Sequence, residues 1–363
     1  MLCTSKLCKK TVSLTYYTIL HCFVDFCCIY YMVQVVMPTC WEIGMENWLL
    51  YGVLYNFIAF AGQLPVGIFG DWLQRNSYMV AVGLLCLLSV YMGIGFGLPL
   101  LPAVLLLGIG NACFHVGGGR EAMAYRENAC QPVGIFVATG AFGVFGGNWV
   151  AGHGMNWLPA MAVVLGIALL LQLILCYKTT VKNQVKQTIS FHPEKGSWSL
   201  LLAVCCILVV VLRSFAGTVF HFPWSSGWLA LLMTVGIVLG KAVGGILADR
   251  FGIRPTVLVS LSCSALLFLG ANAIPVVGLL AVFLFNMTMP ITLSLLGTQF
   301  PAAKGTAFGA LTFAIFIGLI PSYFCNTYQF SRSWISLLLS AASLILLYVP
   351  LWLEKRQDCA VKS

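Results

Sequence analysis

Residues 245–254 read Gly245-Ile-Leu-Ala-Asp249-Arg250-Phe-Gly252-Ile-Arg254, a short polar stretch between two long apolar runs. A related stretch, Gly67-Ile-Phe-Gly-Asp71-Trp-Leu-Gln-Arg75, lies between two apolar runs nearer the N-terminus. The two aspartates are 178 residues apart, about half of the 363-residue chain. Two copies at this separation indicate that the chain is built from two related halves.

Twelve apolar runs make up most of the chain around these stretches. They cover residues 14–36, 48–69, 78–97, 99–118, 132–152, 155–177, 199–221, 226–247, 256–274, 276–298, 306–325 and 333–353. Each run is close to the roughly 20 apolar residues that a helix needs to cross a bilayer. Only 8% of the residues are charged, whereas a soluble domain carries about a quarter. The sequence therefore excludes a soluble enzyme or binding module, and it predicts an all-α polytopic membrane protein with twelve transmembrane helices.

The positive charges predict how the chain is oriented in the membrane. Sixteen of the 19 Lys and Arg residues lie at the two ends and in alternate connections, namely Lys6, Lys9, Lys10, Arg75, Arg120, Arg126, Lys178, Lys182, Lys186, Lys195, Arg250, Arg254, Lys304, Lys355, Arg356 and Lys362. The opposite connections hold only Arg332. Because connections rich in Lys and Arg stay in the cytoplasm, we expect a multi-pass protein of the cell membrane with both termini cytoplasmic. The charges form no single patch, so the net charge of +9 does not indicate a nucleic-acid partner.

The stretch at 245–254 closely resembles the GxLADRxGRK signature of the major facilitator superfamily, and the stretch at 67–75 resembles a degenerate copy of it. This resemblance extends over nearly the whole chain. It implies two pseudo-symmetric six-helix bundles that transport a small solute. We accordingly expect one bundle at 1–177, a cytoplasmic linker at 178–198, a second bundle at 199–353 and a cytoplasmic tail at 354–363.

The motif residues form a candidate cytoplasmic gate, which consists of Gly67, Asp71, Arg75, Gly245, Asp249, Arg250, Gly252 and Arg254. Glycine lets neighbouring helices approach closely. An aspartate at the end of a span can accept hydrogen bonds from a neighbouring helix N-terminus and pair with the loop arginine. The first copy has Trp72 and Gln74 where the second has Arg250 and Gly252. For either copy, the alternative is a set of ordinary anchoring charges at the membrane boundary.

A narrower resemblance, to fosmidomycin-resistance-type members of the superfamily, covers about a fifth of the chain. It rests on His21-Cys-Phe-Val-Asp25, Gly108-Ile-Gly-Asn111-Ala-Cys-Phe-His115 and Gly140-Ala-Phe-Gly143-Val-Phe-Gly146-Gly147. That subgroup tends to have His-Pro in the fourth span, where this chain has His115 followed by Val116. The glycine stretch continues with Asn148, where the drug-antiporter signature has proline. These departures do not favour a drug-efflux function.

Two ionisable residues lie near the middle of the first apolar run. His21 and Asp25 are four residues apart and therefore share one face of a helix. A carboxyl group in a low-dielectric cavity can load and release a proton, so Asp25 with His21 is the candidate proton-coupling pair. The alternatives are that Asp25 is a permanent partner of Arg213 and that His21 only forms a hydrogen bond. The pair supplies two metal ligands and no third, so we expect no metal site.

Other polar residues inside the spans are candidate substrate-binding groups, and these are Asn111, His115, Arg213, Lys241 and Asn286. All except Lys241 lie in the first, fourth, seventh or tenth span, which line the central cavity in the resembled fold. A guanidinium group binds carboxylate or phosphate, so Arg213 is the candidate anchor for an anion. The alternatives are an ion pair of Arg213 with Asp25, interhelical hydrogen bonds, and extension of the Lys241 side chain to the membrane surface.

We therefore expect a monomeric secondary transporter that moves a small polar or anionic organic solute by alternating access, coupled to protons through Asp25. An uncoupled uniporter or a transporter-like sensor is the alternative. An intramembrane enzyme is disfavoured, because the spans contain no GxSxG, HExxH or paired catalytic aspartates. We expect no cofactor and no nucleic-acid partner.

Overall fold

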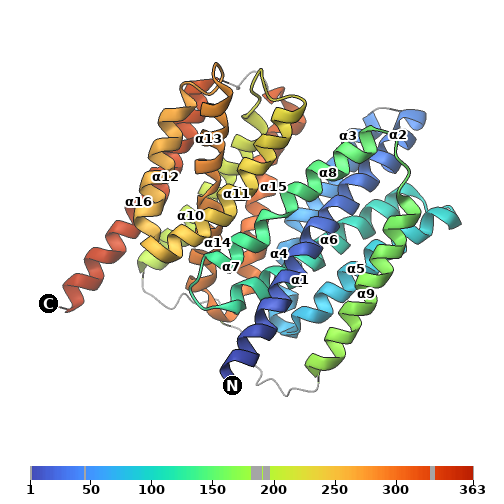
Figure 1. Ribbon diagram of the computed structural model, residues 1–363, viewed down its shortest axis with the longest axis horizontal. Coiled ribbons are helices and arrows are strands. Elements are labelled where there is room, and N and C mark those ends of the chain that lie inside the picture. Colours follow the sequence, from blue (N-terminus) through green and yellow to red (C-terminus); the bar gives the residue numbers. More distant parts are fainter. Residues whose placement is uncertain (1, 45, 181–189, 191–196, 328–331, 363) are drawn as a thin grey trace. The chain divides into compact units, whose positions relative to one another are not determined.

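The computed structural model describes residues 2–44, 46–180, 190, 197–327 and 332–362, and this part of the chain contains helices and no strand (Figure 1). The α-helices are α1 (Leu2–Tyr31), α2 (Met37–Ile43), α3 (Glu46–Asn56), α4 (Gln63–Leu73), α5 (Asn76–Gly93), α6 (Leu100–Tyr125), α7 (Gln131–Ala138), α8 (Gly140–Gly152), α9 (Leu158–Thr180), α10 (Ser197–Val219), α11 (Trp228–Phe251), α12 (Ile253–Phe268), α13 (Pro275–Asn286), α14 (Thr288–Gln299), α15 (Lys304–Phe324) and α16 (Ser333–Lys362). The shorter turns are the π-helical η1 (Met32–Val36) and η2 (Phe57–Ala61) and the 3-10 helical η3 (Ile94–Phe96) and η4 (Pro301–Ala303). The all-α prediction is confirmed. Most of the predicted linker at 178–198 lies outside the described residues, and α16 continues through most of the predicted tail.

Eleven helical stretches in the described part of the chain are long and apolar enough to cross a membrane. They are Lys10–Glu42, Trp48–Leu73, Asn76–Phe96, Leu100–Tyr125, Gln131–Gly152, Leu158–Tyr177, Ser199–Val219, Trp228–Phe251, Pro275–Gln299, Pro301–Phe324 and Ser333–Glu354. Each coincides with one of the twelve predicted runs. The ninth run, 256–274, forms the shorter apolar helix α12. Its 16 residues rise about 24 Å, and turns from Leu269 onward lead into α13. The ninth span is therefore shorter than predicted.

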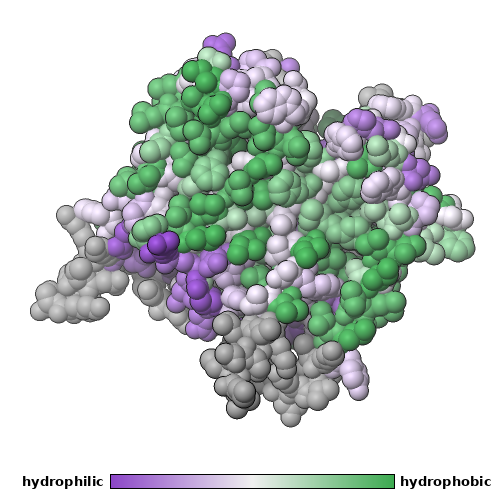
Figure 2. Space-filling view, viewed as in Figure 1, coloured by the Kyte–Doolittle hydropathy of each residue, from purple (hydrophilic) through white to green (hydrophobic). Residues whose placement is uncertain are grey.

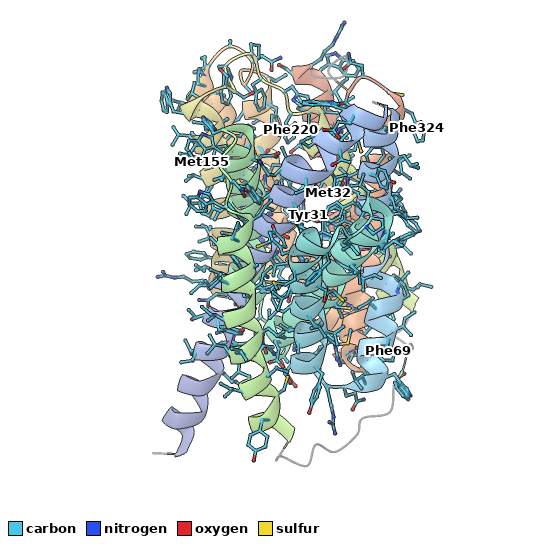
Figure 3. The ribbon with its side chains drawn as sticks, turned by 90° about the vertical axis from the view of Figure 1, so that its right-hand side faces the viewer. Tyr31, Met32, Phe69, Met155, Phe220 and Phe324 are labelled. Carbon is cyan, nitrogen blue, oxygen red and sulfur yellow. The ribbon has the colours of Figure 1, made fainter. Side chains whose placement is uncertain are left out.

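Four of the spans are interrupted rather than continuous α-helices. The first and second contain the π turns η1 and η2, and the fifth and tenth break at Thr139 and Met287. Tyr31 and Met32, both labelled in Figure 3, mark the change from α1 to η1. The Thr139 hydroxyl donates a hydrogen bond to the Thr18 carbonyl (2.7 Å), which fixes the break in the fifth span against α1. Because π turns often accompany functional sites, the first span is a place to look for one.

The helices group into two units. Unit 1 consists of Met1–Tyr125, Thr139–Ile189 and Lys304–Phe313, and unit 2 consists of Arg126–Ala138, Ser190–Ala303 and Ala314–Ser363. Each unit thus contains a short segment from the other half of the sequence. The beginning of α15 belongs to unit 1, and α7 belongs to unit 2, where it packs against α11 and α14.

Within unit 1, α8 lies along α1 and contacts it through glycines (Figure 1). A Cβ atom at position 147 would lie 2.7 Å from the Phe26 carbonyl oxygen, and one at position 143 would lie 2.9 Å from both the Phe26 nitrogen and the Asp25 Cβ. Such distances are too short for real Cβ contacts, so only glycine allows the two backbones to come this close. The glycine stretch of the fifth span therefore sets the position of the helix that carries Asp25.

Replacing Gly143 with alanine should destabilise the protein by about 1–3 kcal/mol, the usual range for overpacking a tight contact. The matched control is Gly152→Ala in the same helix, where a Cβ has no neighbour within 4 Å. Since alanine favours helix more than glycine does, the control should leave the melting temperature unchanged or raise it. Melting temperatures of the purified variants in detergent measure both effects, and equal values for the two would refute the close packing.

The exposed surface of the helices is largely apolar. On α9, for example, the exposed side chains include Val163, Ile167, Leu170, Leu171 and Ile174, and Figure 2 shows hydrophobic residues along this helix and along α12. A soluble monomer rarely exposes apolar patches larger than a few hundred Å². Surfaces of this kind suit a hydrocarbon environment, so charged residues in the interior stand out as candidates for function.

Candidate functional site

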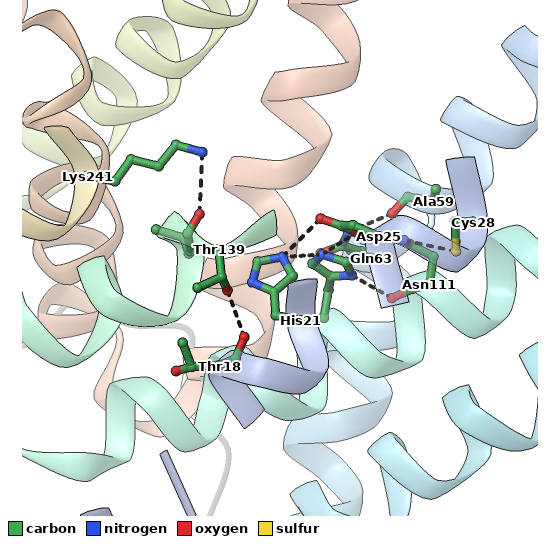
Figure 4. A network of polar contacts seen from close by, with 11 residues as sticks. Thr18, His21, Asp25, Cys28, Ala59, Gln63, Asn111, Thr139 and Lys241 are labelled. Carbon is green, nitrogen blue, oxygen red and sulfur yellow. Dashed lines mark hydrogen bonds and ion pairs between the residues drawn. The ribbon is translucent and has the colours of Figure 1, made fainter. Parts of the chain in front are cut away.

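Four polar residues of α1 and α6 meet in the interior of unit 1 (Figure 4). Asp25 Oδ2 lies 3.3 Å from His21 Nε2, and Asp25 Oδ1 lies 3.4 Å from His115 Nε2. The two histidine Nε2 atoms are 2.9 Å apart, and the Asn111 side-chain amide donates to Asp25 Oδ1 (3.3 Å). The sequence placed His21 and Asp25 on one face, and it assigned Asn111 and His115 to substrate. The structure joins all four in one cluster, in which Asp25 has two histidine partners from its own unit.

Hydrogen bonding determines where the cluster holds its protons. His115 Nδ1 lies 2.9 Å from the Asn111 carbonyl oxygen, and a carbonyl only accepts, so Nδ1 carries hydrogen. In the neutral imidazole, His115 Nε2 then presents a lone pair toward His21 Nε2 and Asp25. The carboxylate also only accepts, so at least one proton or another positive centre must lie among these atoms. A hydrogen on His21 Nε2, which faces both His115 Nε2 and Asp25 Oδ2, or a bound cation would meet this need.

A second polar centre lies in unit 2 around Arg213, which α10 holds in the interior with 8% of its surface exposed. Its Nη2 donates to the Thr288 hydroxyl (2.6 Å). Nε and Nη1 are buried and have no hydrogen-bond partner among the described residues. A buried guanidinium with two unused donors is energetically costly unless a ligand completes it.

Arg213 lines a cavity of about 100 Å³ whose other walls include Phe220, Met233, Phe285 and Asn286. The sequence singled out Arg213 and Asn286 separately, and the structure places both on this one cavity. The Asn286 amide nitrogen donates to the Val282 carbonyl (2.8 Å) within its own helix. Sequence reasoning missed Thr288, because a lone threonine in an apolar run carries no signal of its own.

Lys241 is used locally in unit 2. Its Nζ donates to the Val137 carbonyl oxygen (3.3 Å), in the last turn of the short helix α7. The last four carbonyls of a helix lack partners within it, and a cation near them is favourable. This contact is an alternative to the predicted roles of Lys241, namely substrate binding and extension to the membrane surface.

The first motif aspartate binds the start of α15. Asp71 is buried and accepts hydrogen bonds from the backbone nitrogens of Gly305 (2.8 Å) and Thr306 (2.7 Å) and from the Thr306 hydroxyl (2.7 Å). A Cβ at Gly67 would lie 3.1 Å from Thr306 N and nearer still to Gly305. As predicted, Asp71 accepts hydrogen bonds from the N-terminus of a neighbouring helix, and Gly67 lets the two helices approach closely.

The arginine that forms an ion pair with Asp71 is Arg120, and not the predicted loop arginine Arg75. Arg120, at the end of α6, pairs with Asp71 (Nε to Oδ1, 3.1 Å) and also donates to the Gly70 carbonyl (2.6 Å). Arg75 instead lies over the Tyr78 ring, 5.3 Å from its centroid. The loop arginine was chosen for its nearness in sequence, whereas the arginine that reaches the carboxylate comes from another helix.

The second motif repeats this arrangement in unit 2. Asp249 accepts from the backbone nitrogens of Cys130 (2.7 Å) and Gln131 (3.1 Å), at the start of α7, and forms an ion pair with Arg126. A Cβ at Gly245 would lie 2.7 Å from the Cys130 carbonyl oxygen, so this glycine again allows the close approach.

Arg250 is not the ion-pair partner of Asp249, because its guanidinium lies over the Phe251 ring, 5.4 Å from the centroid. Arg254 and Arg126 line a surface cleft of about 860 Å³ beside Asp249 and Gly252.

Both motifs end their helices at a residue with positive φ, although the two backbone conformations differ. Gly252, three residues after Asp249, has φ of +97°. Gln74 occupies the same place after Asp71 and has φ of +54°. Glycine adopts positive φ without steric cost, whereas other residues lose about 1–2 kcal/mol. The degenerate copy therefore ends its helix in the left-handed conformation without glycine, at some cost in strain.

Cys130 offers a way to test the contact that Asp249 makes. This residue is 1% exposed, and burial raises the pKa of its thiol to about 12, so at pH 7 it is an unreactive neutral thiol. We expect N-ethylmaleimide to modify Cys130 far more slowly than the exposed Cys325. Asp249→Ala should speed the reaction at Cys130 about tenfold or more, because the start of α7 loses two hydrogen bonds.

Timed labelling followed by peptide mass spectrometry gives the rate at each cysteine. Since the thiolate fraction rises with pH below the pKa, the rate at Cys130 should still be increasing at pH 10. Glu127→Ala, an exposed acid in the same connection, is the control and should leave the rate unchanged. An unchanged rate in Asp249→Ala would show that this carboxylate does not hold the start of α7.

No protein-family model matches the sequence, and a search of curated proteins finds no match. Solved structures do match over nearly the whole chain. The structure of a variant of the Escherichia coli fucose:proton symporter FucP has a TM-score of 0.60 at 13% identity and covers 94% of this chain and 99% of its own. A structure of FucP in the outward conformation, described as a major facilitator superfamily transporter, has a TM-score of 0.57 at 13% identity, with 92% and 99% covered.

A bacterial homologue of the iron transporter ferroportin, in an outward-facing state with soaked iron, has a TM-score of 0.64 at 13% identity and covers 94% of this chain and 98% of its own. At this identity the likeness establishes the fold, which is that of the major facilitator superfamily. The fold that the sequence motifs implied is therefore confirmed. The narrower subgroup resemblance stays a prediction.

Proposed function

We propose that this protein, whose helices adopt the major facilitator fold, is a secondary active transporter that moves a small polar or anionic organic solute across the cell membrane by alternating access. In this proposal Asp25 and His21 couple transport to protons, and both termini lie on the cytoplasmic side. The observation that carries the proposal is Arg213, a buried guanidinium on the wall of a small cavity, two of whose nitrogens have no hydrogen-bond partner among the residues that the structure describes. An ionised group at membrane depth is costly, so its retention there favours a role in binding.

The chemistry of the Arg213 cavity favours a solute with an acidic or strongly accepting group. Guanidinium nitrogens only donate, and carboxylate and phosphate oxygens only accept. Phe220, Met233 and Phe285 make the remaining wall apolar, which suits a small organic body attached to that group. Asn286 lines the same cavity and adds an amide that can recognise a further polar group.

The cluster of His21, Asp25 and His115 supports proton coupling. Its facing acceptors can be satisfied by a hydrogen held among them, and histidine and aspartate both exchange protons readily. The fucose transporter of the same fold is named as a proton symporter. The neighbours are transporters, which favours this proposal over an intramembrane enzyme.

The two motif carboxylates are the proposed gate. Asp71 and Asp249 each hold the start of a helix from the other half of the sequence, α15 and α7. Charge-assisted bonds of this kind are strong yet reversible. Alternating access would require the hydrogen bonds of Asp71 and those of Asp249 to break when the protein opens toward the cytoplasm.

A two-step experiment tests the proposal. A thermal-shift screen of purified protein against anionic solutes (pyruvate, glutamate, inorganic phosphate), neutral sugars and cations such as choline identifies the class that stabilises it. The stabilising solute is then offered, radiolabelled, to proteoliposomes with an imposed pH gradient. We expect an anionic or polar solute to accumulate above its external concentration only when the gradient is present. Equilibration unaffected by the gradient would indicate a uniporter and overturn the coupling.

A further inference from the structure

Three potential metal ligands in unit 1 converge on one point. His21 Nε2, His115 Nε2 and an Asp25 carboxylate oxygen all lie within 4.8 Å of one another. The sequence argued against a metal because the His21–Asp25 pair lacked a third ligand, and the fold supplies that ligand from α6. Two histidines and one carboxylate are a recurrent ligand set for first-row transition metals, and three protein ligands leave a position open for water.

The spacing of these atoms fits a tetrahedral metal. With metal–ligand bonds of 2.0–2.1 Å, two ligand atoms of a tetrahedral site lie about 3.3 Å apart. The observed distances are 3.3 Å from His21 to Asp25, 3.4 Å from His115 to Asp25 and 2.9 Å between the histidines. Both distances to Asp25 match the edge of the tetrahedron, but they run to different carboxylate oxygens, Oδ2 and Oδ1. Binding through one oxygen requires the carboxyl group to turn, and the two histidine nitrogens need to separate by about 0.4 Å more on that geometry.

The ligands are also oriented as metal ligands are. The second ring nitrogen of a metal-bound histidine almost always donates to a carbonyl or carboxylate, which turns the lone pair of the other nitrogen toward the metal. His115 does this through Nδ1 and the Asn111 carbonyl (2.9 Å). The Asn111 side chain in turn donates to Asp25 Oδ1 (3.3 Å). One residue of α6 thus positions two of the three ligands.

Gly140 supplies an independent observation. A Cβ at this position would lie 2.6 Å from His21 Nε2 and closer still to Asp25 Oδ2. Those separations are shorter than real Cβ contacts, so only glycine lets α8 pack this closely against the two ligand atoms and keep them where they are. Any other residue at position 140 would place its Cβ against these atoms and displace them.

We propose that His21, Asp25 and His115 form a binding site for one divalent first-row transition-metal cation such as Zn²⁺ or Co²⁺. The site goes beyond the proposed transport of an organic solute and does not depend on it. Because the same carboxylate is assigned to proton coupling, the test measures binding to purified protein rather than transport.

The test is a cobalt titration of the full-length protein in detergent, purified without a histidine tag and washed with EDTA. Bound Co²⁺ is followed by its visible absorption, and Zn²⁺ is then added in competition. The variants are His115→Gln, which removes a ligand, and Gly140→Ala, which keeps all three ligands but displaces two of them. The matched controls are His153→Gln, an exposed histidine, and Gly152→Ala, where a Cβ meets nothing within 4 Å.

We expect one Co²⁺ per chain, displaced by Zn²⁺, with affinity at least tenfold weaker in His115→Gln and in Gly140→Ala and unchanged in both controls. Melting curves in EDTA identify variants that fail to fold. If His115→Gln or Gly140→Ala does not fold, His21→Gln is used in its place. Binding that is equal in all variants, absent from wild type, or accompanied by thiolate-to-cobalt charge-transfer absorption would overturn the site. Cobalt binding without proton-driven transport would support the metal site and contradict the proposed function. Proton-driven transport without cobalt binding would support the proposed function and contradict the metal site.

Discussion

Exchanging Asp25 for asparagine is expected to abolish proton-driven accumulation of the solute while leaving exchange of preloaded solute intact. The asparagine amide keeps the shape of the carboxyl group but can neither bind nor release a proton near neutral pH. Proton coupling needs such a group, whereas solute exchange does not. Accumulation in proteoliposomes with an imposed pH gradient should fall from many times the external concentration to the level reached without a gradient.

The cluster around Asp25 makes this experiment specific. Asparagine keeps one acceptor oxygen but replaces the other with an NH2 donor, so His21 and His115 no longer face two charged oxygens. A loss of stability could therefore imitate a loss of function, and the melting temperature of the variant must be measured alongside. Glu127→Gln removes an exposed carboxylate in a connection and should leave accumulation unchanged. If Asp25→Asn still accumulated solute, coupling through Asp25 would be refuted whatever the solute.

Replacing Arg213 with methionine should abolish solute binding and, at the same time, stabilise the solute-free protein. Two guanidinium nitrogens are buried with no partner in the described part of the chain, and replacing a buried ionic group by an apolar one of similar size stabilises proteins by about 1–4 kcal/mol in several systems. Truncating one partner of a buried charged contact weakens binding by about 2–5 kcal/mol, or roughly 30-fold to several thousand-fold. Melting temperatures with and without the solute from the screen measure both effects in one assay.

The opposite signs of these two changes distinguish binding from structural support. A purely structural arginine would give a lower melting temperature when replaced, with the solute-induced shift retained. Arg213→Lys keeps the charge but loses the fixed guanidinium geometry, so the shift should be smaller than in wild type but present. Arg332→Met, an exposed arginine outside the helices, is the control and should alter neither value.

How much could be predicted differs between the fold and the site. The apolar runs and the two motif copies predicted the helices, since hydrophobic length and local pattern are properties of contiguous sequence. The shortness of α12 was missed because its apolar run continues past Phe268, where the chain turns toward Pro275. Hydropathy alone does not mark such a turn.

The site was predicted only where its residues share a helix. His21 and Asp25 were paired by their spacing of four residues. Arg120 and Arg126 were overlooked as partners of the motif aspartates in favour of Arg75 and Arg250, which are nearer in sequence.

By itself, the sequence determined that the chain is a membrane protein of two related halves, that charge is kept inside particular spans, and that each motif carries a carboxylate at a helix end. Only the tertiary structure decided which groups those carboxylates bind and that His115 joins His21 and Asp25. It also decided that Arg213 faces a cavity with two nitrogens unpartnered within the described ranges. The physical reason is that helical periodicity relates only residues within a few positions of one another. Each of these contacts joins segments about 75 to 235 residues apart, and whether such segments meet depends on how the helices pack.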